Sequence, residues 1–157
     1  MYSLAQLNLL MNYLASKKKN KKSEVFNFKN NEEIPYVTIQ LPVYNELYVM
    51  ERLLKNIAKL EYPREKLEIQ VLDDSTDDTT GIIDEAVQII KSKGIDISVI
   101  RRKDRIGFKA GALAYATPLA KGDFISIFDA DFIPIKSFLK DTVGYFSDPK
   151  VGLVQTR

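Results

Sequence analysis

FISIFDADFIP, residues 124–134, joins a hydrophobic strand to a pair of carboxylates. Phe124–Phe128 has the length and composition of a buried strand, and Asp129 and Asp131 follow it directly. Side chains two residues apart at a strand end point the same way, so both carboxylates are able to approach one divalent cation. Hard oxygen ligands favour Mg²⁺ or Mn²⁺, which predicts such a metal here; the alternative is a capped turn before Pro134.

Strands and helices alternate along the chain around this segment. We expect strands at Tyr36–Leu41, Leu67–Leu72, Ile95–Ile100, Phe124–Phe128 and Val151–Val154, and helices at Glu46–Leu60, Thr79–Lys93, Lys109–Ala120 and Ile135–Phe146. This order predicts an α/β fold, a mainly parallel sheet with helices on both faces. Ligands of such sheets bind beyond the carboxyl ends of the strands, and functional residues should therefore follow strands.

The composition limits the chemistry that the chain can carry out. The 157 residues include no cysteine and no histidine, so acid–base or metal chemistry must rest on carboxylates. Residues 1–30 hold six lysines against one glutamate, whereas the remainder of the chain is net acidic. Nucleic acid is therefore excluded as a partner of the main domain, because its charge is acidic where a ligand would bind.

The N-terminal arm is predicted to be separate from the domain that follows it. We divide the chain into residues 1–34, an apolar helix with a lysine-rich linker, and residues 35–157, a ligand-binding α/β domain. The apolar part of the arm is shorter than the roughly 20 residues that a membrane span needs. Two interpretations stay open: a helix that covers the domain, or the end of a membrane or interfacial helix whose lysines mark the cytoplasmic side.

Three further predicted strands end in polar sequence. Pro42–Glu46 follows the first strand, Asp73–Thr79 the second, and the cation-rich Arg101–Arg105 the third, with Lys109 at the start of the next helix. Backbone N–H groups and lysine at a helix start suit a diphosphate, and acidic residues opposite them suit a metal. Together these segments predict a site for a metal and a nucleoside diphosphate.

Each segment alone has a simpler explanation. Pro42–Glu46 is compatible with a plain helix cap, and the cation-rich loop with a solvated surface. Helix capping explains part of Asp73–Thr79, but not both Asp73 and Asp74 at the strand end. A calcium-binding EF-hand loop is excluded, because neither starting aspartate places a glycine at the sixth position.

Four motifs resemble those of the inverting family 2 glycosyltransferases, in particular the membrane-bound branch of cellulose synthases and glucomannan synthases. They are LPVYNE (41–46), VLDDSTDDT (71–79), RIGFKAGAL (105–113) and FDADFIP (128–134). The resemblance extends from about Pro35 to Arg157. It implies the nucleotide-diphospho-sugar transferase (GT-A) type of α/β domain. It also implies an enzyme that transfers a hexose from UDP-glucose or GDP-mannose to a polysaccharide or lipid acceptor, at the cytoplasmic face of a membrane.

The resemblance also implies roles for individual residues. Pro42, Tyr44 and Glu46 would line the nucleotide, Asp74 together with Asp73 would hold the base and ribose, and Lys109 would face the nucleotide or its diphosphate. Asp129 and Asp131 match the family's Asp-x-Asp motif and would bind Mg²⁺ or Mn²⁺, with Asp131 as the direct ligand. The family's general base and acceptor motifs would lie beyond Arg157. We therefore expect a truncated domain that binds donor without transferring sugar.

Two rival functions follow from the same elements. A response-regulator-like domain also binds Mg²⁺, but it requires a lone aspartate after a middle strand, where this sequence has Arg101 and Arg102. A nucleotidyltransferase that makes nucleotide sugars requires a glycine-rich loop after the first strand, and Pro42–Glu46 contains no glycine. Each of the two rival hypotheses therefore predicts residues at the strand ends that differ from those in this sequence.

Overall fold

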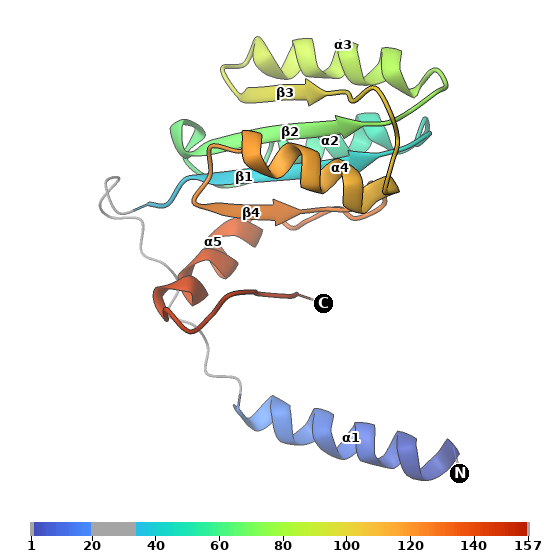
Figure 1. Ribbon diagram of the computed structural model, residues 1–157. Coiled ribbons are helices and arrows are strands. Elements are labelled where there is room, and N and C mark those ends of the chain that lie inside the picture. Colours follow the sequence, from blue (N-terminus) through green and yellow to red (C-terminus); the bar gives the residue numbers. More distant parts are fainter. Residues whose placement is uncertain (1, 20–33, 157) are drawn as a thin grey trace.

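The computed structural model describes residues 2–19 and 34–156, and its centre is a four-stranded parallel sheet within that part of the chain. The strands are β1 (Val37–Val43), β2 (Leu67–Asp73), β3 (Asp96–Ile100) and β4 (Phe124–Ile127). Their order is β3-β2-β1-β4 (Figure 1). The chain places β2 and β3 on one side of β1 and then crosses to the other side for β4. The carboxyl ends of β1 and β4 therefore flank a topological switch point, where ligands of such sheets bind.

Helices cover both faces of the sheet, as predicted. The helices of the domain are α2 (Met50–Ile57), α3 (Thr79–Lys91), α4 (Phe108–Ala116) and α5 (Phe138–Val143), with short 3₁₀ turns η2 (Arg64–Lys66), η3 (Thr117–Leu119) and η4 (Gly144–Ser147). In Figure 1, α4 lies in front of the sheet and α2 behind it. α4 packs on the front face of the sheet through Ala112 and Ala116, which contact Leu72 of β2. Small residues on α4 bring its first turn close to the strand ends.

The main core lies on the face opposite α4. Alternate residues of β1 and β2, such as Ile39 and Ile69, are fully buried there. They meet the apolar side of α2, which includes Leu53, and that of α3, which includes Ile83. The side-chain periods of a strand and of a helix explain why one face of each element is apolar.

The other face of the sheet contains a buried polar layer. Thr38 donates from its hydroxyl to Glu68 Oε2 at 2.7 Å, and Gln40 Nε2 donates to Gln70 Oε1 at 3.0 Å. The backbone N–H of Lys121, in the loop before β4, also donates to Glu68 Oε2, at 2.9 Å. Leaving the buried Glu68 carboxylate without hydrogen-bond donors would destabilise the fold. Its donors come from β1 and from the loop before β4, so these bonds hold that loop against β1 and β2.

Gly122 allows this loop to approach β1. A Cβ at Gly122 would overlap the backbone nitrogen of Thr38 and lie 2.7 Å from the carbonyl oxygen of Phe124. We expect Gly122→Ala to lower the free energy of unfolding by about 2 kcal/mol, because backbone atoms must move to admit the methyl group. Denaturant unfolding followed by circular dichroism measures the change.

Gly81 provides the matched control for this substitution. It lies in α3, and a Cβ there meets nothing within 4 Å. Gly81→Ala should leave stability unchanged or raise it by up to about 1 kcal/mol, since alanine favours helix. Equal effects of the two substitutions would contradict the packing assigned to Gly122.

β4 differs from the prediction of a buried strand. It forms the edge of the sheet, and Ile125 and Ile127 are 37% and 48% exposed. The predicted fifth strand at Val151–Val154 is wrong, because residues 151–156 have no assigned secondary structure. Gly152–Thr156 instead lies across a groove of about 710 Å³ from β4, so the two backbones do not pair. Apolar sequence indicated a strand, but pairing depends on a neighbour that local sequence does not specify.

The predicted helix at Glu46–Leu60 begins later than expected, with α2 at Met50. Asn45 adopts a left-handed backbone conformation (φ 55°), and its side-chain oxygen accepts a hydrogen bond from the Thr76 N–H at 2.9 Å. Its own N–H donates to Ser75 Oγ at 3.0 Å. Asn45 therefore links the loops after β1 and β2 instead of capping a helix. This linkage holds two of the strand ends together.

The predicted N-terminal helix is present as α1 (Tyr2–Lys19), which extends through the first lysines of the arm. Its described side chains, those of residues 6–14, are all exposed, and Figure 1 shows α1 apart from the sheet. The helix does not cover the domain in this structure, and both interpretations of the arm stay predictions. No helix in the described ranges has both the length and the hydropathy to cross a membrane. The linker lysines Lys21, Lys22 and Lys29 lie outside the described residues.

Candidate nucleotide and metal site

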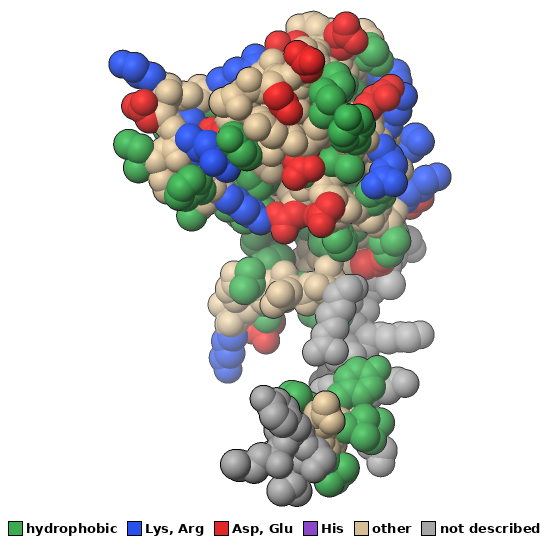
Figure 2. Space-filling model, turned by 90° about the vertical axis from the view of Figure 1, so that its right-hand side faces the viewer, with side chains coloured by type: hydrophobic (Ala, Val, Ile, Leu, Met, Phe, Trp, Pro, Cys, Tyr) green, Lys and Arg blue, Asp and Glu red, His purple; other side chains and the backbone are tan. Residues whose placement is uncertain are grey.

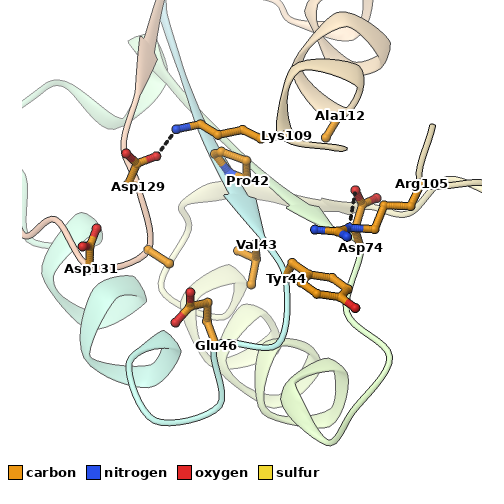
Figure 3. Close-up of a pocket in the computed structure, with 11 residues that line it drawn as sticks. Pro42, Val43, Tyr44, Glu46, Asp74, Arg105, Lys109, Ala112, Asp129 and Asp131 are labelled. Atoms are coloured by element: carbon orange, nitrogen blue, oxygen red, sulfur yellow. Dashed lines mark hydrogen bonds and ion pairs between the residues drawn. The ribbon is translucent and has the colours of Figure 1, made fainter. Parts of the chain in front are cut away.

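A cavity of about 430 Å³ opens at the carboxyl ends of the strands, at the switch point between β1 and β4. Figure 2 looks onto this end of the sheet, where acidic and basic side chains lie next to one another. The cavity is lined by Pro42, Val43, Tyr44, Glu46, Asp74, Arg105, Lys109, Ala112, Asp129, Ala130 and Asp131. These residues come from the end of β1, from the loops after all four strands and from α4 (Figure 3).

Asp74 is held by an arginine from the loop after β3. Arg102 Nε and Nη2 donate to the two carboxylate oxygens of Asp74 at 2.8 and 2.6 Å. Both side chains are nearly buried, with 9% and 7% of their surface exposed. The same guanidinium donates to the carbonyl oxygens of Ile106 and Phe108 at 2.6 and 2.8 Å. Arg102 therefore fixes the position of Asp74 and the path of the loop before α4, and its bond to Asp74 raises the pKa of the guanidinium.

Asp73 does not line the cavity. Its side chain is fully buried on the core side of the sheet, where Arg101 Nε donates to it at 2.8 Å. Arg101 Nη2 also donates to Asp84 of α3 at 2.9 Å. Burial lowers the pKa of Arg101, but the hydrogen bonds to Asp84 and Asp73 outweigh this effect and raise it. Arg101, Asp73 and Asp84 thus form a structural link between β2, β3 and α3.

These two pairs explain why two adjacent aspartates lie at the end of β2, Asp73 as its last residue and Asp74 directly after it. Each aspartate has its own arginine, and their side chains leave the strand on opposite faces. The sequence predicted that the cations of the loop after β3 would face a diphosphate. Arg101 and Arg102 instead serve as counter-ions within the protein, and of that loop only Arg105 lines the cavity.

Arg105 forms one wall of the cavity together with Tyr44. The guanidinium carbon lies 3.4 Å from the centre of the Tyr44 ring, a stacked cation–π contact. Arg105 Nε is 3.9 Å from Asp74 Oδ2, which is too far for a hydrogen bond, and this buried nitrogen has no acceptor among the described residues. A buried donor without an acceptor beside a carboxylate indicates a place for a polar ligand.

Gly111 allows the loop before α4 to pack under this wall. A Cβ at Gly111 would overlap the carbonyl oxygen of Ile106 and would lie 2.5 Å from Arg102 Nη1. The backbone of α4 at Gly111 therefore lies directly against the loop that precedes the helix. This contact orients the first turn of α4 and with it Lys109.

Lys109 and the Asp-x-Asp pair form the opposite side of the cavity. Lys109 Nζ contacts Asp129 Oδ1, and both Asp129 and Asp131 line the cavity. The two aspartates lie in a turn closed by the Phe132 N–H to Asp129 O bond of 3.0 Å, because β4 ends at Ile127. The strand alternation from which we predicted their common direction therefore does not apply, although both carboxylates reach the same cavity.

The cavity brings together seven of the eight residues predicted to bind the nucleotide, its sugar or the metal. Pro42, Tyr44, Glu46, Asp74, Lys109, Asp129 and Asp131 line it, and Asp73 does not. The prediction did not single out Arg105 among the cations of its loop, although Arg105 lies at the start of the RIGFKAGAL motif, four residues before Lys109. Arg105 and Lys109 are two cations close to the start of the same helix, and this proximity in the sequence could have indicated that Arg105 also faces the ligand.

Comparison with known proteins identifies the family to which this arrangement belongs. The sequence model described as Glycosyl transferase family 2 matches residues 38–157. The chain belongs to this family. The family 2 chain is 40% identical over 134 residues to probable glucomannan 4-beta-mannosyltransferase 7 of Oryza sativa subsp. japonica, covering 82% of this chain and 23% of that protein. It is 36% identical over 134 residues to glucomannan 4-beta-mannosyltransferase 1 of Cyamopsis tetragonoloba, covering 82% of this chain and 26% of that protein.

Solved structures confirm the GT-A type of fold. The mannosyltransferase PcManGT from Pyrobaculum calidifontis, in complex with GDP-Man and Mn²⁺, superposes with a TM-score of 0.74 at 33% identity, over 92% of this chain and 41% of that one. S. aureus TarS 1-349 in complex with UDP superposes with a TM-score of 0.62 at 25% identity, over 72% and 32% of the two chains. The family 2 chain spans about a quarter of the length of its curated plant relatives. Membership in this family removes the response-regulator and nucleotidyltransferase hypotheses.

Proposed function

We propose that this chain is the donor-binding part of a metal-dependent mannosyltransferase that uses GDP-mannose. The observation that carries the proposal is one cavity in which Asp74, Arg105 and Lys109 face the Asp-x-Asp pair. The choice of donor is supported by the 33% identity to a mannosyltransferase bound to GDP-Man and Mn²⁺ and by the plant glucomannan mannosyltransferases.

The wall formed by Tyr44, Arg105 and Asp74 suits a nucleotide base. The stacked Tyr44 and Arg105 side chains offer a planar surface, and the Arg105 Nε lacks an acceptor among the described residues. A carboxylate accepts several hydrogen bonds, so Asp74 retains lone pairs beyond those bound by Arg102. Guanine offers two adjacent N–H donors to a carboxylate and uracil offers one, so this wall favours guanine.

The opposite side of the cavity suits a divalent cation and a diphosphate. Asp129 and Asp131 supply hard oxygen ligands, which fit Mg²⁺ or Mn²⁺, and Lys109 supplies a cation for phosphate oxygens. The metal would neutralise the charge that develops on the departing nucleoside diphosphate. Inversion at the sugar requires a base for the acceptor hydroxyl, and we assign that base and the polysaccharide or lipid acceptor site to parts of the protein outside this chain.

We also propose that the whole protein acts at the cytoplasmic face of a membrane. The support is the exposed apolar surface of α1 and the lysines that follow it in the sequence. The apolar side chains of this surface are Leu7, Leu9, Leu10, Met11, Tyr13 and Leu14. Binding of the chain to vesicles that contain anionic lipids, measured by sedimentation, tests this placement.

Calorimetric titration of the folded chain with GDP and with UDP, each with and without Mn²⁺ or Mg²⁺, tests the donor. We expect metal-dependent binding with GDP preferred by about ten-fold, the value of one additional hydrogen bond to a charged group. Circular dichroism establishes the folded state beforehand. Preference for UDP would indicate UDP-glucose as donor, and binding that is independent of the metal would contradict the role of the Asp-x-Asp pair.

A further inference from the structure

The contact between Lys109 and Asp129 lies where the metal is proposed to bind. Figure 3 shows the Lys109 amino group reaching across the top of the cavity to Asp129, with Asp131 on the same side. The two paired side chains are 51% and 59% exposed. Exposed ion pairs stabilise a fold little, so this contact is easily exchanged for another.

The protein supplies few ligands for a divalent cation. Nowhere in the described ranges do three or more His, Cys, Asp or Glu side chains gather in a way that would hold a metal ion. Asp129 and Asp131 therefore provide two carboxylates, and the remaining ligands must be water or the phosphates of the nucleotide. A cation of this kind binds well when protein and diphosphate contribute ligands together.

The position of Lys109 near the N-terminus of α4 is electrostatically unfavourable for the helix. It is the second residue of α4, and the first turn of a helix carries a partial positive charge that disfavours cations. A lysine there gains from a negative partner, and in this structure that partner is Asp129. The diphosphate of a nucleotide would be a second and more highly charged partner at the same helix end.

We propose that Lys109 exchanges partners when the donor binds. Without metal, the Lys109 amino group neutralises Asp129; with metal and nucleotide, Asp129 turns to the cation and Lys109 to the diphosphate. Lys109 thereby couples the two binding events. A metal ion that binds alone must displace the amino group from Asp129 and is repelled by its positive charge. When nucleotide binds as well, the diphosphate becomes a new partner for the amino group, and each ligand favours binding of the other. This inference rests on the proposed function of the cavity.

Electron paramagnetic resonance of Mn²⁺ tests the exchange without measuring sugar transfer, since the signal of free Mn²⁺ reports binding directly. The chain is titrated with Mn²⁺ alone and with Mn²⁺ in the presence of GDP. In the native chain, GDP should tighten Mn²⁺ binding at least about ten-fold. In Lys109→Met, Mn²⁺ alone should bind about three- to ten-fold more tightly, and the effect of GDP should shrink by a similar factor.

Two further variants make the result specific. Lys109→Arg retains the cation and should resemble the native chain. Lys140→Met removes a lysine that pairs with Glu61 at 2.8 Å, away from the cavity, and should leave Mn²⁺ binding unchanged. Lys109→Gln repeats the measurement with a second neutral side chain if the methionine variant proves unfolded by circular dichroism.

The outcomes separate the inference from the function on which it rests. If the native chain binds Mn²⁺ and GDP in a coupled manner and the neutral Lys109 variants show the same affinities and the same coupling, the exchange is overturned and the proposed function stands. If the folded native chain binds neither Mn²⁺ nor GDP, the proposed function fails and the exchange fails with it. Weaker binding of Mn²⁺ alone to the neutral variants would also overturn the exchange.

Discussion

Asp131→Ala is expected to weaken metal-dependent binding of GDP by about 100-fold or more. The two carboxylates that line the cavity on the Asp-x-Asp side are the metal ligands that we propose, and loss of one leaves the cation with a single protein ligand. The metal then no longer bridges the protein and the diphosphate, and the electrostatic attraction between them falls. Calorimetry with GDP and Mn²⁺ measures the affinity.

Asp104→Ala controls for the loss of one negative charge. Asp104 is exposed in the loop before α4 and does not line the cavity, so its replacement should change the affinity less than about three-fold. Circular dichroism shows whether each variant is folded. Native affinity in a folded Asp131→Ala chain would remove Asp131 from the metal site and leave Asp129 as the carboxylate to examine.

Arg102→Met is expected to lower the free energy of unfolding by about 3 kcal/mol. The substitution leaves the nearly buried Asp74 carboxylate without its bidentate partner, at 2.8 and 2.6 Å, and removes the donor to the Ile106 and Phe108 carbonyls. Removing one partner of a buried ion pair lowers the free energy of unfolding by more than the intact pair contributes, because the remaining charge is buried without a counter-ion. Denaturant unfolding measures this loss, and GDP affinity should fall as well.

Two comparisons show whether the buried pair causes the loss. Arg64→Met removes an exposed guanidinium whose one hydrogen bond to the described residues runs from Nη1 to the Lys93 carbonyl at 2.6 Å, and it should cost less than about 1 kcal/mol. Removing Asp74 as well, in the double variant Asp74→Leu with Arg102→Met, should restore part of the stability, because no buried charge remains. A double variant no more stable than Arg102→Met would show that the bonds to the loop dominate.

The sequence by itself determined the class of fold, the position of the site and most of its residues. Apolar residues with period 2 or 3.6 indicated strands and helices in alternation, and that order implies a parallel sheet with its site at the carboxyl ends of the strands. Polar segments that follow strands were therefore assigned to one site before their contacts were known. Seven of the predicted residues line the cavity because this argument depends on order along the chain, which the sequence contains.

The tertiary structure alone decided which charges meet. Asp73 and Asp74 are adjacent in sequence, but the strand directs them to opposite faces, where Arg101 takes one and Arg102 the other. Pairing also decided that β4 is an edge strand and that Val151–Val154 is not a strand, since a ladder needs a partner. Ion pairs and strand pairs join residues far apart in sequence, and local patterns specify the groups available but not which of them lie within reach.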